Sequence, residues 1–360
     1  MPLQFVNLSK ITACSQRIAL LGAGVLWLVA STFAYAASPT DVRVSLGQRL
    51  FADAALSRDG KVSCQTCHDP AHAYASPQPK AVGVDGKTGT RNAPSLVGIA
   101  SDTTFFWDGR RSHLKNAVVD PLTNPVELGL SSRDEVVRRL RADPAIVRAF
   151  HAAYSTDPIS FAQVQDALAS FVRSLTTGTS AFDRSQSGGL PLPAQARQGK
   201  ALFAGIGGCS ACHALTGSPP RFSDNQYHHS GIGPAPAKRL PALAQAVVHA
   251  NLDASGLGPK VLANADWSAL GRFAVSHNPA DIGAFHTPSL RNVAVSAPYM
   301  HDGSIATLRE AVDHEVYYRG FSTGHPVNLT DEERRALVSF LESLTDTAYA
   351  PHAVARKTAP

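Results

Sequence analysis

Two short strings carry the residue types that could do chemistry in this chain of 360 residues. They are CQTCH at 64–68 and CSACH at 209–213, and in each a histidine directly follows a C-x-x-C pair. This is the attachment signature of a c-type haem, in which two thioethers fix the porphyrin and the histidine reaches the iron. A zinc site would need ligands at other spacings, and a thioredoxin-like pair needs neither the histidine nor a second copy. The sequence therefore predicts two covalently bound haems c. Their attachment and axial residues are Cys64, Cys67 and His68 in the first site, and Cys209, Cys212 and His213 in the second.

The N-terminal segment has the pattern of a secretory signal peptide. Lys10 and Arg17 precede an apolar run over residues 18–33, and the small-x-small triplet at 34–36 is a cleavage pattern. We expect residues 1–36 to be removed on export, which places the mature chain in the periplasm. A retained membrane anchor is the alternative. No later segment is apolar for long enough to span a bilayer.

Composition and charge limit the classes of partner. The chain has 33 Lys and Arg against 28 Asp and Glu, a net charge of +5 that falls to +3 without the two cations of the signal peptide. A nucleic-acid-binding protein would show clustered basic residues, so no nucleic-acid partner is expected, and weak docking of an acidic protein stays open. Cys14 lies in the signal peptide, so the four other cysteines all belong to the haem motifs.

The chain consists of two similar halves, which indicates a duplicated haem module. The repeated features occur in the same order in both halves, before and after the haem motif. They are the Gly-x-x-Leu-Phe strings at 47–51 and 199–203, the Arg-Asn pairs at 91–92 and 291–292, the Asp-Gly pairs at 108–109 and 302–303, and the strings ALASFVRSLT at 167–176 and ALVSFLESLT at 336–345.

The predicted fold is mainly α, with two cytochrome c-like haem domains related by internal duplication and few short strands. Residues 161–175 place apolar side chains every three or four positions, as one face of a helix does. Ser160 with Gln163, and Thr330 with Glu333, have the spacing of capping boxes at the starts of two helices. Alternation with a period of two is short wherever it occurs, so strands should be few.

A stretch rich in Gly, Ser and Pro at 183–194 is the best candidate for a domain boundary. We therefore place an N-terminal haem c domain at 37–190 and a C-terminal haem c domain at 191–360. Residues 214–282 have no counterpart in the first half, and their Pro, Gly and Ala content predicts long loops around the second haem.

These features resemble the bacterial dihaem cytochrome c peroxidase family, which includes the MauG-type enzymes. The resemblance covers roughly residues 45–345. Its most specific strings are LGQRLF, LSRDGKVSCQTCHDP, RNAPSL, FFWDGR, NPVELG, TPSLRNVAVSAPYMHDG and LVSFLESLT. The family implies a peroxidatic first haem that reacts with hydrogen peroxide, and a C-terminal haem that transfers electrons or shares oxidising equivalents.

The resemblance also implies roles for three residues near the first haem. Trp107 in WDGR matches a tryptophan between the haems, where an aromatic ring can relay electrons; it could equally serve as a buried anchor. Glu127 in NPVELG matches a distal glutamate, and a carboxylate there can move a proton from one peroxide oxygen to the other. Pro121 matches a proline on the distal face, where it could also simply form a turn.

A calcium ion between the domains is a further implication of the resemblance alone. Asn92 would offer its side-chain oxygen, and Ser296 and Pro298 their carbonyl oxygens, which are the ligand types that calcium prefers. His301, in PYMHDG, would support the haem environment or form a structural hydrogen bond.

The sequence departs from the classical peroxidases at the first haem. Where those enzymes carry a histidine that closes the first iron, seven residues before Arg91, this chain has Val84, which cannot ligate iron. His72 lies too close behind His68 to replace it. We therefore expect an open sixth position, as in the MauG branch, and no need for reductive activation. A family-typical distal glutamine is replaced by Ala117.

The sixth ligand of the second haem is a second departure. Twelve residues after Gly303, the peroxidases have methionine and the MauG branch has tyrosine, whereas this chain has Glu315. Tyr318, about one helical turn beyond, and Met300 are the alternatives. A surface glutamate with no sixth ligand at all is the fourth possibility.

Two functions follow from the resemblance. The leading hypothesis is an exported dihaem peroxidase that reduces hydrogen peroxide to water with electrons from a small cytochrome c or a cupredoxin. The alternative is a MauG-like oxidase that uses peroxide to modify residues of a partner protein. A plain electron-transfer cytochrome would have no use for Glu127 or for an open iron.

Overall fold

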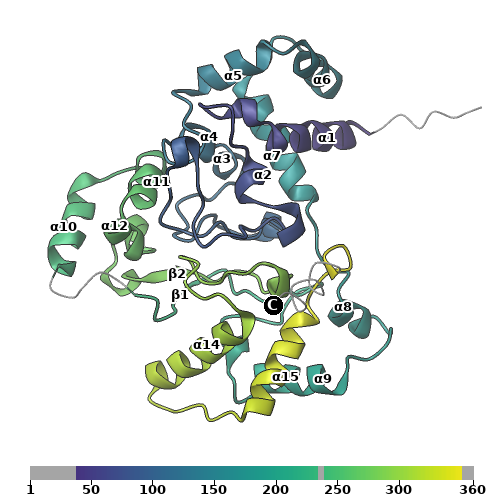
Figure 1. The fold of residues 1–360 in the computed structure, drawn as a ribbon, viewed down its shortest axis with the longest axis vertical. Helices are drawn as coiled ribbons and strands as arrows, with labels where there is room; N and C mark the ends of the chain where they lie inside the picture. The colour runs from purple at the N-terminus through teal and green to yellow at the C-terminus, as the bar shows by residue number, and fades with distance from the viewer. Residues whose placement is uncertain (1–37, 234–238, 351–360) are drawn as a thin grey trace, which may run out of the picture. The chain divides into compact units, whose positions relative to one another are not determined.

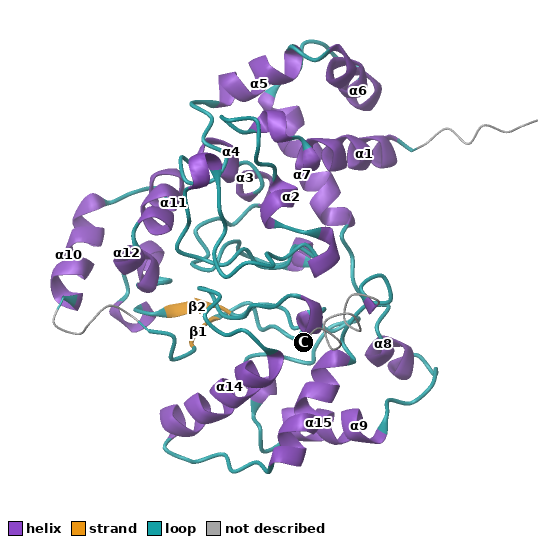
Figure 2. Ribbon diagram, in the orientation of Figure 1, coloured by secondary structure: helices purple, strands orange, loops and turns teal. Residues whose placement is uncertain are grey.

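The computed structural model describes residues 38–233 and 239–350, and the predicted signal peptide at 1–36 lies outside them. Within the described residues the chain is mainly helical, as predicted (Figure 2). The strands found there are two three-residue segments, β1 (Tyr227–His229) and β2 (Ala284–His286), which pair antiparallel with Tyr227 opposite His286.

Each half is a set of helices around one attachment motif (Figure 1). The helices of the first half are α1 (Pro39–Ala52), α2 (Cys64–Cys67), α3 (Leu114–Ala117), α4 (Asp120–Thr123), α5 (Arg133–Arg141), α6 (Pro144–Tyr154) and α7 (Phe161–Ser174). Those of the second half are α8 (Ala181–Gln186), α9 (Ala194–Ala204), α10 (Leu240–Ala250), α11 (Ala254–Ala263), α12 (Ala265–Ala269), α13 (Phe273–Ser276), α14 (Leu308–Thr323) and α15 (Asp331–Glu342).

The same close helix crossing organises both halves. In α1, a Cβ added to Gly47 would lie 2.0 Å from the carbonyl oxygen of Ala167 in α7. In α9, a Cβ added to Gly199 would lie 1.9 Å from the carbonyl oxygen of Ala336 in α15. Only glycine permits this approach of two backbones. The repeated Gly-x-x-Leu-Phe string therefore marks a repeated helix–helix contact, which supports the duplication.

The helix starts follow the capping patterns in the sequence. Ser160 and Gln163 form a reciprocal capping box before α7, and Thr330 and Glu333 form one before α15. Each box satisfies backbone N–H groups that have no partner within the helix. Both predicted starts are confirmed.

Two separate hydrophobic cores lie under the two motifs, and the chain passes from one to the other earlier than predicted. The first core ends with Leu175, directly after α7, whereas Phe182 in α8 is buried in the second core among other phenylalanine rings. Asp183 of α8 also pairs with Arg291, at 2.5 Å. The passage between the cores is thus at 176–180, ahead of the predicted boundary at 190, because an apolar and an ionic contact fix α8 to the second half.

Residues 214–282 follow the prediction of long loops around the second haem only in part. Residues 214–226 form a loop, as predicted. Residues 240–276 instead carry helices α10 to α13, which share a small core that includes Val247, Leu257 and Phe273. The prediction was wrong for these helices because the Pro, Gly and Ala content hid apolar residues at helical spacing. These helices lie beside the first half (Figure 1): the Thr90 hydroxyl donates to the Val261 carbonyl at 2.6 Å.

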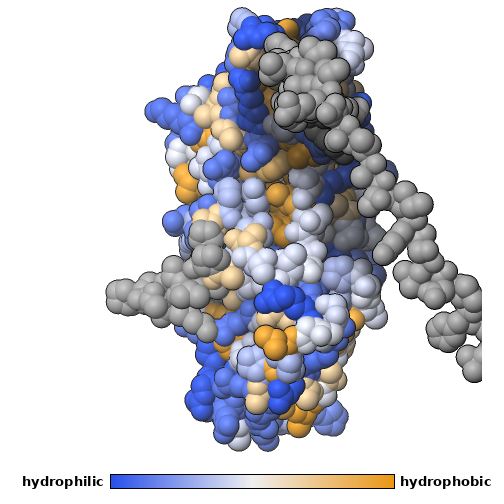
Figure 3. Space-filling view, turned by 90° about the vertical axis from the view of Figure 1, so that its right-hand side faces the viewer, coloured by the Kyte–Doolittle hydropathy of each residue, from blue (hydrophilic) through white to orange (hydrophobic). Residues whose placement is uncertain are grey.

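The surface carries few large apolar side chains. Leu190, Ile206, Tyr317 and Phe321 are the most exposed of them. On the face in Figure 3, hydrophilic side chains predominate and apolar ones form small separate patches. Among the described residues, we find no helix with the length and apolar character needed to cross a bilayer.

The glycine crossing predicts a large effect from one added methyl group. Gly47→Ala should lower the free energy of unfolding by about 1–3 kcal/mol, the usual range for overpacking, because α1 and α7 must separate. Denaturant unfolding of the holoprotein measures this. Gln48→Ala, on the exposed face of the same helix, is the control and should change stability little. Equal stability of the two variants would contradict the crossing.

Candidate haem sites

The first attachment motif forms one helical turn that ends at its histidine. Cys64 and Cys67 bound α2, both have free thiols, and His68 caps the turn. The His68 Nδ1 lies 2.9 Å from the Tyr74 carbonyl oxygen and 3.1 Å from that of Pro94. Two carbonyl acceptors require Nδ1–H, which leaves Nε2 as the free ligand nitrogen. Burial lowers the pKa of His68, so the imidazole is neutral as ligation requires.

The second motif repeats this arrangement. His213 follows Cys212, and its Nδ1 lies 2.9 Å from the Phe222 carbonyl oxygen. The Pro288 carbonyl is a second partner, and burial lowers the pKa of His213. Each imidazole therefore has its tautomer and ring orientation set by backbone carbonyls.

The proline carbonyls that bind the two histidines show which residues of the two halves correspond, and they change one match made from the sequence. Pro94 in the first half matches Pro288 in the second, because each supports a proximal histidine. The Arg-Asn pair precedes that proline in the first half and follows it in the second, so the predicted match of 91–92 with 291–292 is wrong. The two arginines accordingly have different partners: Arg91 pairs with Asp108 at 2.6 Å, whereas Arg291 pairs with Asp183.

The match of the Asp-Gly pairs is supported, and it extends further along the chain. Phe106 and Met300, two residues before each pair, both have φ of 71°. The following α3 and α14 begin at Leu114 and Leu308, at the same spacing. Counted from the Asp-Gly pair of each half, Pro121 in the first module and Glu315 in the second occupy the same position.

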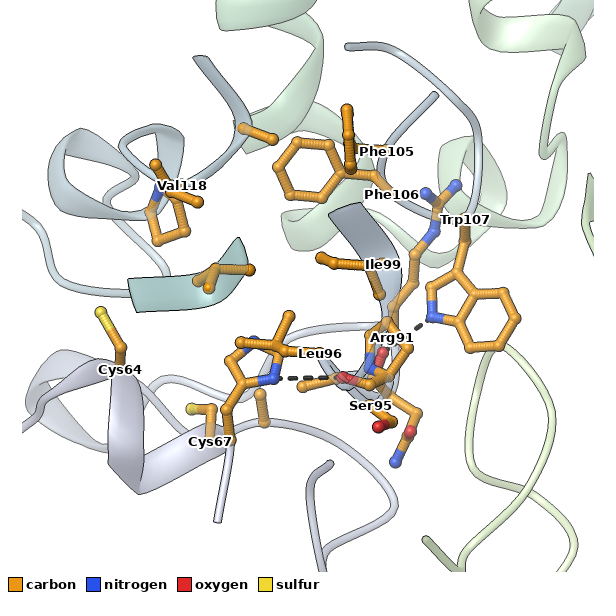
Figure 4. A pocket seen from close by; sticks show the side chains of 18 of the residues that line it. Cys64, Cys67, Arg91, Ser95, Leu96, Ile99, Phe105, Phe106, Trp107 and Val118 are labelled. Atoms are coloured by element: carbon orange, nitrogen blue, oxygen red, sulfur yellow. Dashed lines mark hydrogen bonds between the residues drawn. The ribbon is translucent and has the colours of Figure 1, made fainter. Parts of the chain in front are cut away.

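A large cavity opens beside the first motif (Figure 4). In this view the Cys64 and Cys67 thiols lie on one side and the Trp107 indole on the other. Most of the lining is apolar; it includes Leu96, Ile99, Phe105, Val118, Leu128 and Leu168.

The polar end of this cavity supports the fit of a haem. Arg221 and His286, both from the second half, line the cavity. Within the described part of the chain, Arg221 Nε and His286 Nε2 are buried without a hydrogen-bond partner. Such groups are costly unless a ligand satisfies them. Asp102 also lines this cavity and pairs with Arg221 at 2.5 Å. A haem combines an apolar macrocycle with anionic propionates, which suits an apolar cavity that has unsatisfied nitrogen donors at one end.

Glu127 faces the same cavity, as the resemblance predicted. The carboxyl is only partly covered by protein, but desolvation raises its pKa to about 7, and the charge of Asp120 adds to this rise. The Arg110 charge and a hydrogen bond from Asn124 act in the opposite direction. A carboxyl that titrates near neutrality is suited both to accept and to return a proton.

A close backbone contact holds the Glu127 segment in place. A Cβ added to Gly83 would lie 2.0 Å from the Val126 carbonyl oxygen. The Val84 N–H donates to the Glu127 carbonyl at 2.8 Å, and the Val84 side chain is fully buried outside the cavity lining. The position that carries an iron ligand in classical peroxidases thus supports Glu127 here.

Two of the other residues considered for the distal side line the cavity, and one does not. Pro121 and Ala117 both line the cavity. His72 does not line it; its Nδ1 lies 2.8 Å from the Asp69 carboxylate. His72 is therefore oriented by a neighbour on its own turn.

Trp107 connects the first cavity with both halves of the chain. The indole Nε1 donates to the Asn92 carbonyl at 2.9 Å, and the Trp107 carbonyl accepts from the His286 N–H at 2.8 Å. Asn92 in turn donates its N–H to the His301 carbonyl at 2.9 Å. His301 stacks on Phe285 with ring centroids 3.6 Å apart. This position suits both a relay and an anchor.

The predicted calcium residues lie around the same junction. Asn92 is buried, and its amide Nδ2 donates to the Gln78 carbonyl at 2.9 Å. Ser296 and Pro298 lie in the segment just before His301, whose carbonyl binds the Asn92 N–H. Calcium binding stays a prediction.

At the second site, α14 presents Glu315 beside the attachment cysteines. The Glu315 side chain is exposed, but nearby protein desolvates it and raises its pKa, and its charge acts on both Cys209 and Cys212. Arg319, one turn on, acts on the same two thiols. Tyr318 lies elsewhere, with its ring over Gly231, where an added Cβ would be 2.3 Å away.

Four charged or polar residues of the first cavity were not predicted from the sequence: Asp102, Arg110, Arg221 and His286. Arg110 ends the FFWDGR string that carried the resemblance, three residues after Trp107, so this string was a usable signal. Arg221 and His286 come from the second half, and nothing local to them indicates that they reach the first site.

Comparison with known proteins places this arrangement among di-haem enzymes. Residues 41–189 match the model of the di-haem cytochrome c peroxidase family. The chain is 36% identical over 314 residues to the methylamine utilization protein MauG of Methylorubrum extorquens, covering 85% of this chain and 78% of that protein. It is 35% identical over 308 residues to the cytochrome-c peroxidase IdrP2 of Denitromonas iodatirespirans, covering 84% and 81%.

Solved structures give the same result. A MauG-like protein associated with microbial copper homeostasis aligns with a TM-score of 0.71 and 28% identity, over 87% of this chain and 92% of that one. The diheme peroxidase BthA of Burkholderia thailandensis aligns with a TM-score of 0.65 and 25% identity, over 85% and 86%.

The raised pKa of Glu127 predicts the pH dependence of the reaction with peroxide. Only the ionised carboxylate accepts a proton from peroxide, so the rate constant should rise as the pH passes through about 7. Glu127→Gln should remove this rise and slow the reaction about 10²–10⁴-fold while both haems stay bound. Stopped-flow mixing with peroxide measures both effects. Glu332→Gln, on the exposed surface of α15, is the matched control. A Glu127→Gln rate equal to the control would exclude the proton-transfer role.

Proposed function

Because the chain belongs to the di-haem cytochrome c peroxidase family, which includes the MauG proteins, we propose that it is exported to the periplasm and reduces hydrogen peroxide to water there. The observation that carries the proposal is Glu127, a carboxyl of near-neutral pKa that faces the cavity beside the first attachment motif. The overall reaction consumes one peroxide, two electrons and two protons and forms two waters.

The residues of the first site have separable tasks. When bound through Cys64 and Cys67, the haem supplies an iron that accepts a peroxide oxygen and takes up electrons. His68 holds Nε2 toward it, because two carbonyls hold Nδ1. Glu127 takes a proton from one peroxide oxygen and returns it to the other. The apolar lining around them keeps bulk water out.

The second half would supply electrons to this site. Cys209, Cys212 and His213 would hold the second haem, and Trp107 would relay electrons between the two. We propose a small cytochrome c or a cupredoxin as the donor. A calcium ion at Asn92, Ser296 and Pro298 would hold the two domains together at their junction.

A MauG-like oxidation of a partner protein is the second candidate, and Glu315 is the observation that favours it. This carboxylate occupies the position that corresponds to Pro121 of the first module, and it lies beside the second attachment cysteines. A hard anionic ligand stabilises oxidised iron, which suits an enzyme that withdraws electrons from a protein. Relatives of both kinds match this chain at nearly equal identity.

The replacement of a ligand by Val84 predicts the resting state of the first haem. The ferric holoprotein should show a high-spin signal from this haem and should react with peroxide without prior reduction. Electron paramagnetic resonance and stopped-flow spectroscopy measure these properties. Steady turnover with reduced cytochrome c would support the peroxidase, whereas stoichiometric oxidation of a protein without such turnover would support the alternative. Activity that needs pre-reduction would contradict an open site.

Ligation by Glu315 predicts a low reduction potential for the second haem. In Glu315→Met the potential should rise, because a methionine ligand raises it, and the absorption spectrum of this haem should change. Redox titration of wild type and variant measures both, with Glu332→Met on α15 as the control. A high potential in the wild type, or a spectrum that does not respond, would remove Glu315 as a ligand.

A further inference from the structure

A second, polar cavity lies close to the first one, on the side of α4. We call it the α4–α11 cavity. Its volume is about 170 Å³, which is room for several waters. Its lining residues are Arg110, Val119, Asp120, Thr123, Asn124, Arg133, Phe161, Ala254, Ser255, Gly258 and Pro259.

Arg110 and Asn124 form the wall between this cavity and Glu127. Arg110 lines both cavities. Asn124 is buried in the lining of the α4–α11 cavity, and its side chain lies near enough to the Glu127 carboxyl to lower the pKa of that group. The Asn124 Oδ1 accepts from the Val126 N–H at 3.0 Å, so the amide N–H₂ is the group that faces Glu127. The Asn124 side chain thus lies between the α4–α11 cavity and the Glu127 carboxyl.

Arg110 also has a buried donor without a partner next to the lining of the α4–α11 cavity. The residue is 8% exposed, with its Nη1 held by Asp108 at 3.0–3.1 Å and its guanidinium 3.6 Å from the Phe106 ring centroid. Among the described residues its Nε has no hydrogen-bond partner. A Cβ added to Gly258, in the cavity lining, would lie 3.5 Å from this Nε.

Arg111 connects two further polar groups of the lining, Asp120 and Ser255. Arg111 forms a bidentate pair with Asp120, at 2.7 Å for each bond, and also donates to the Ser255 hydroxyl at 2.6 Å. These bonds tie α4 in the first half to α11 in the second. The α4–α11 cavity is therefore a fixed polar space formed by both halves of the chain.

The proposed reaction needs such a space. Glu127 moves a proton within one peroxide molecule, but the later electron transfers require two further protons from solvent, and the first cavity is largely apolar. We propose that the α4–α11 cavity is the water-filled route by which solvent protons reach Glu127, with Arg110 and Asn124 as positioning residues in its wall. This inference rests on the proposed function.

Filling the cavity tests the route. Gly258→Leu and Ala254→Leu both place a larger apolar side chain in it, from two positions of α11. Lys260→Leu, on an exposed position of the same helix, is the control. The first reaction with peroxide needs only the protons that peroxide brings, so its rate should be unchanged. Steady turnover with reduced cytochrome c should fall at least tenfold, with a larger solvent deuterium isotope effect.

The outcomes separate this inference from the proposed function. A wild type that does not reduce peroxide overturns the function itself. An active wild type whose filled variants keep its turnover and isotope effect overturns the route alone. Slowing of the first reaction with peroxide, with later steps unchanged, would show that the cavity admits peroxide and would also overturn the proton route.

A second measurement does not depend on turnover. Asn124→Asp removes the amide donor and adds a negative charge next to Glu127, so the Glu127 pKa should rise. The groups that face Glu127 in the present structure are Arg110, Asp120 and the thiols of Cys64 and Cys67. Infrared titration of the carboxyl band in the resting holoprotein, with Glu127→Gln to assign it, measures the shift. An unchanged titration midpoint would exclude Asn124 as a positioning residue.

Discussion

In each module, the histidine that follows the attachment cysteines is held in one orientation by hydrogen bonds from its Nδ1–H to backbone carbonyls. His68 and His213 each donate to backbone carbonyls, one from an aromatic residue shortly after the motif and one from a proline much further along. These bonds set the tautomer, so that Nε2 is available to a metal in both modules. The proline carbonyl can reach the histidine only if the long segment between them folds back over the motif. The loops around each site are therefore determined by the requirement for a correctly oriented histidine.

The two modules share this frame but are not independent. Helices α11 and α12 have no counterpart in the first half, yet Ser268 binds the buried Arg91, and Val261 binds Thr90. Arg221 and His286, also from the second half, provide the polar end of the first cavity. The chemistry proposed for the first haem thus needs the second half as part of its wall. Removal of residues 240–276, which form helices α10 to α13, would therefore expose the first site.

Local patterns in the sequence were sufficient for helices α7 and α15, the caps and the attachment motifs, because these depend on neighbours within a few positions, whereas they missed helices α10 to α13. Ser160, Thr330 and the two C-x-x-C-H strings are examples. Sequence patterns did not predict the contacts that residues of one half make with the other half. Nothing near His286 indicates that it faces the first cavity, and the repeated Arg-Asn pairs were matched by identity although the structure gives them different partners. Glu127 was found through resemblance, whereas its pKa depends on burial that no spacing reveals.

The difference between the two distal positions gives the duplicated modules different capacities. At the same spacing after Trp107 and His301, the first module has Pro121 and the second has Glu315. Proline has no side-chain donor atom for iron, and Val84 contributes none either, so the first module keeps space for a small substrate above the side that Glu127 faces. A carboxylate at position 315 has two oxygen atoms that could close the second site. Because both modules fix their proximal histidine in the same way, the proposed division of labour, with a reactive first module and a second one that carries electrons, rests on this one exchange.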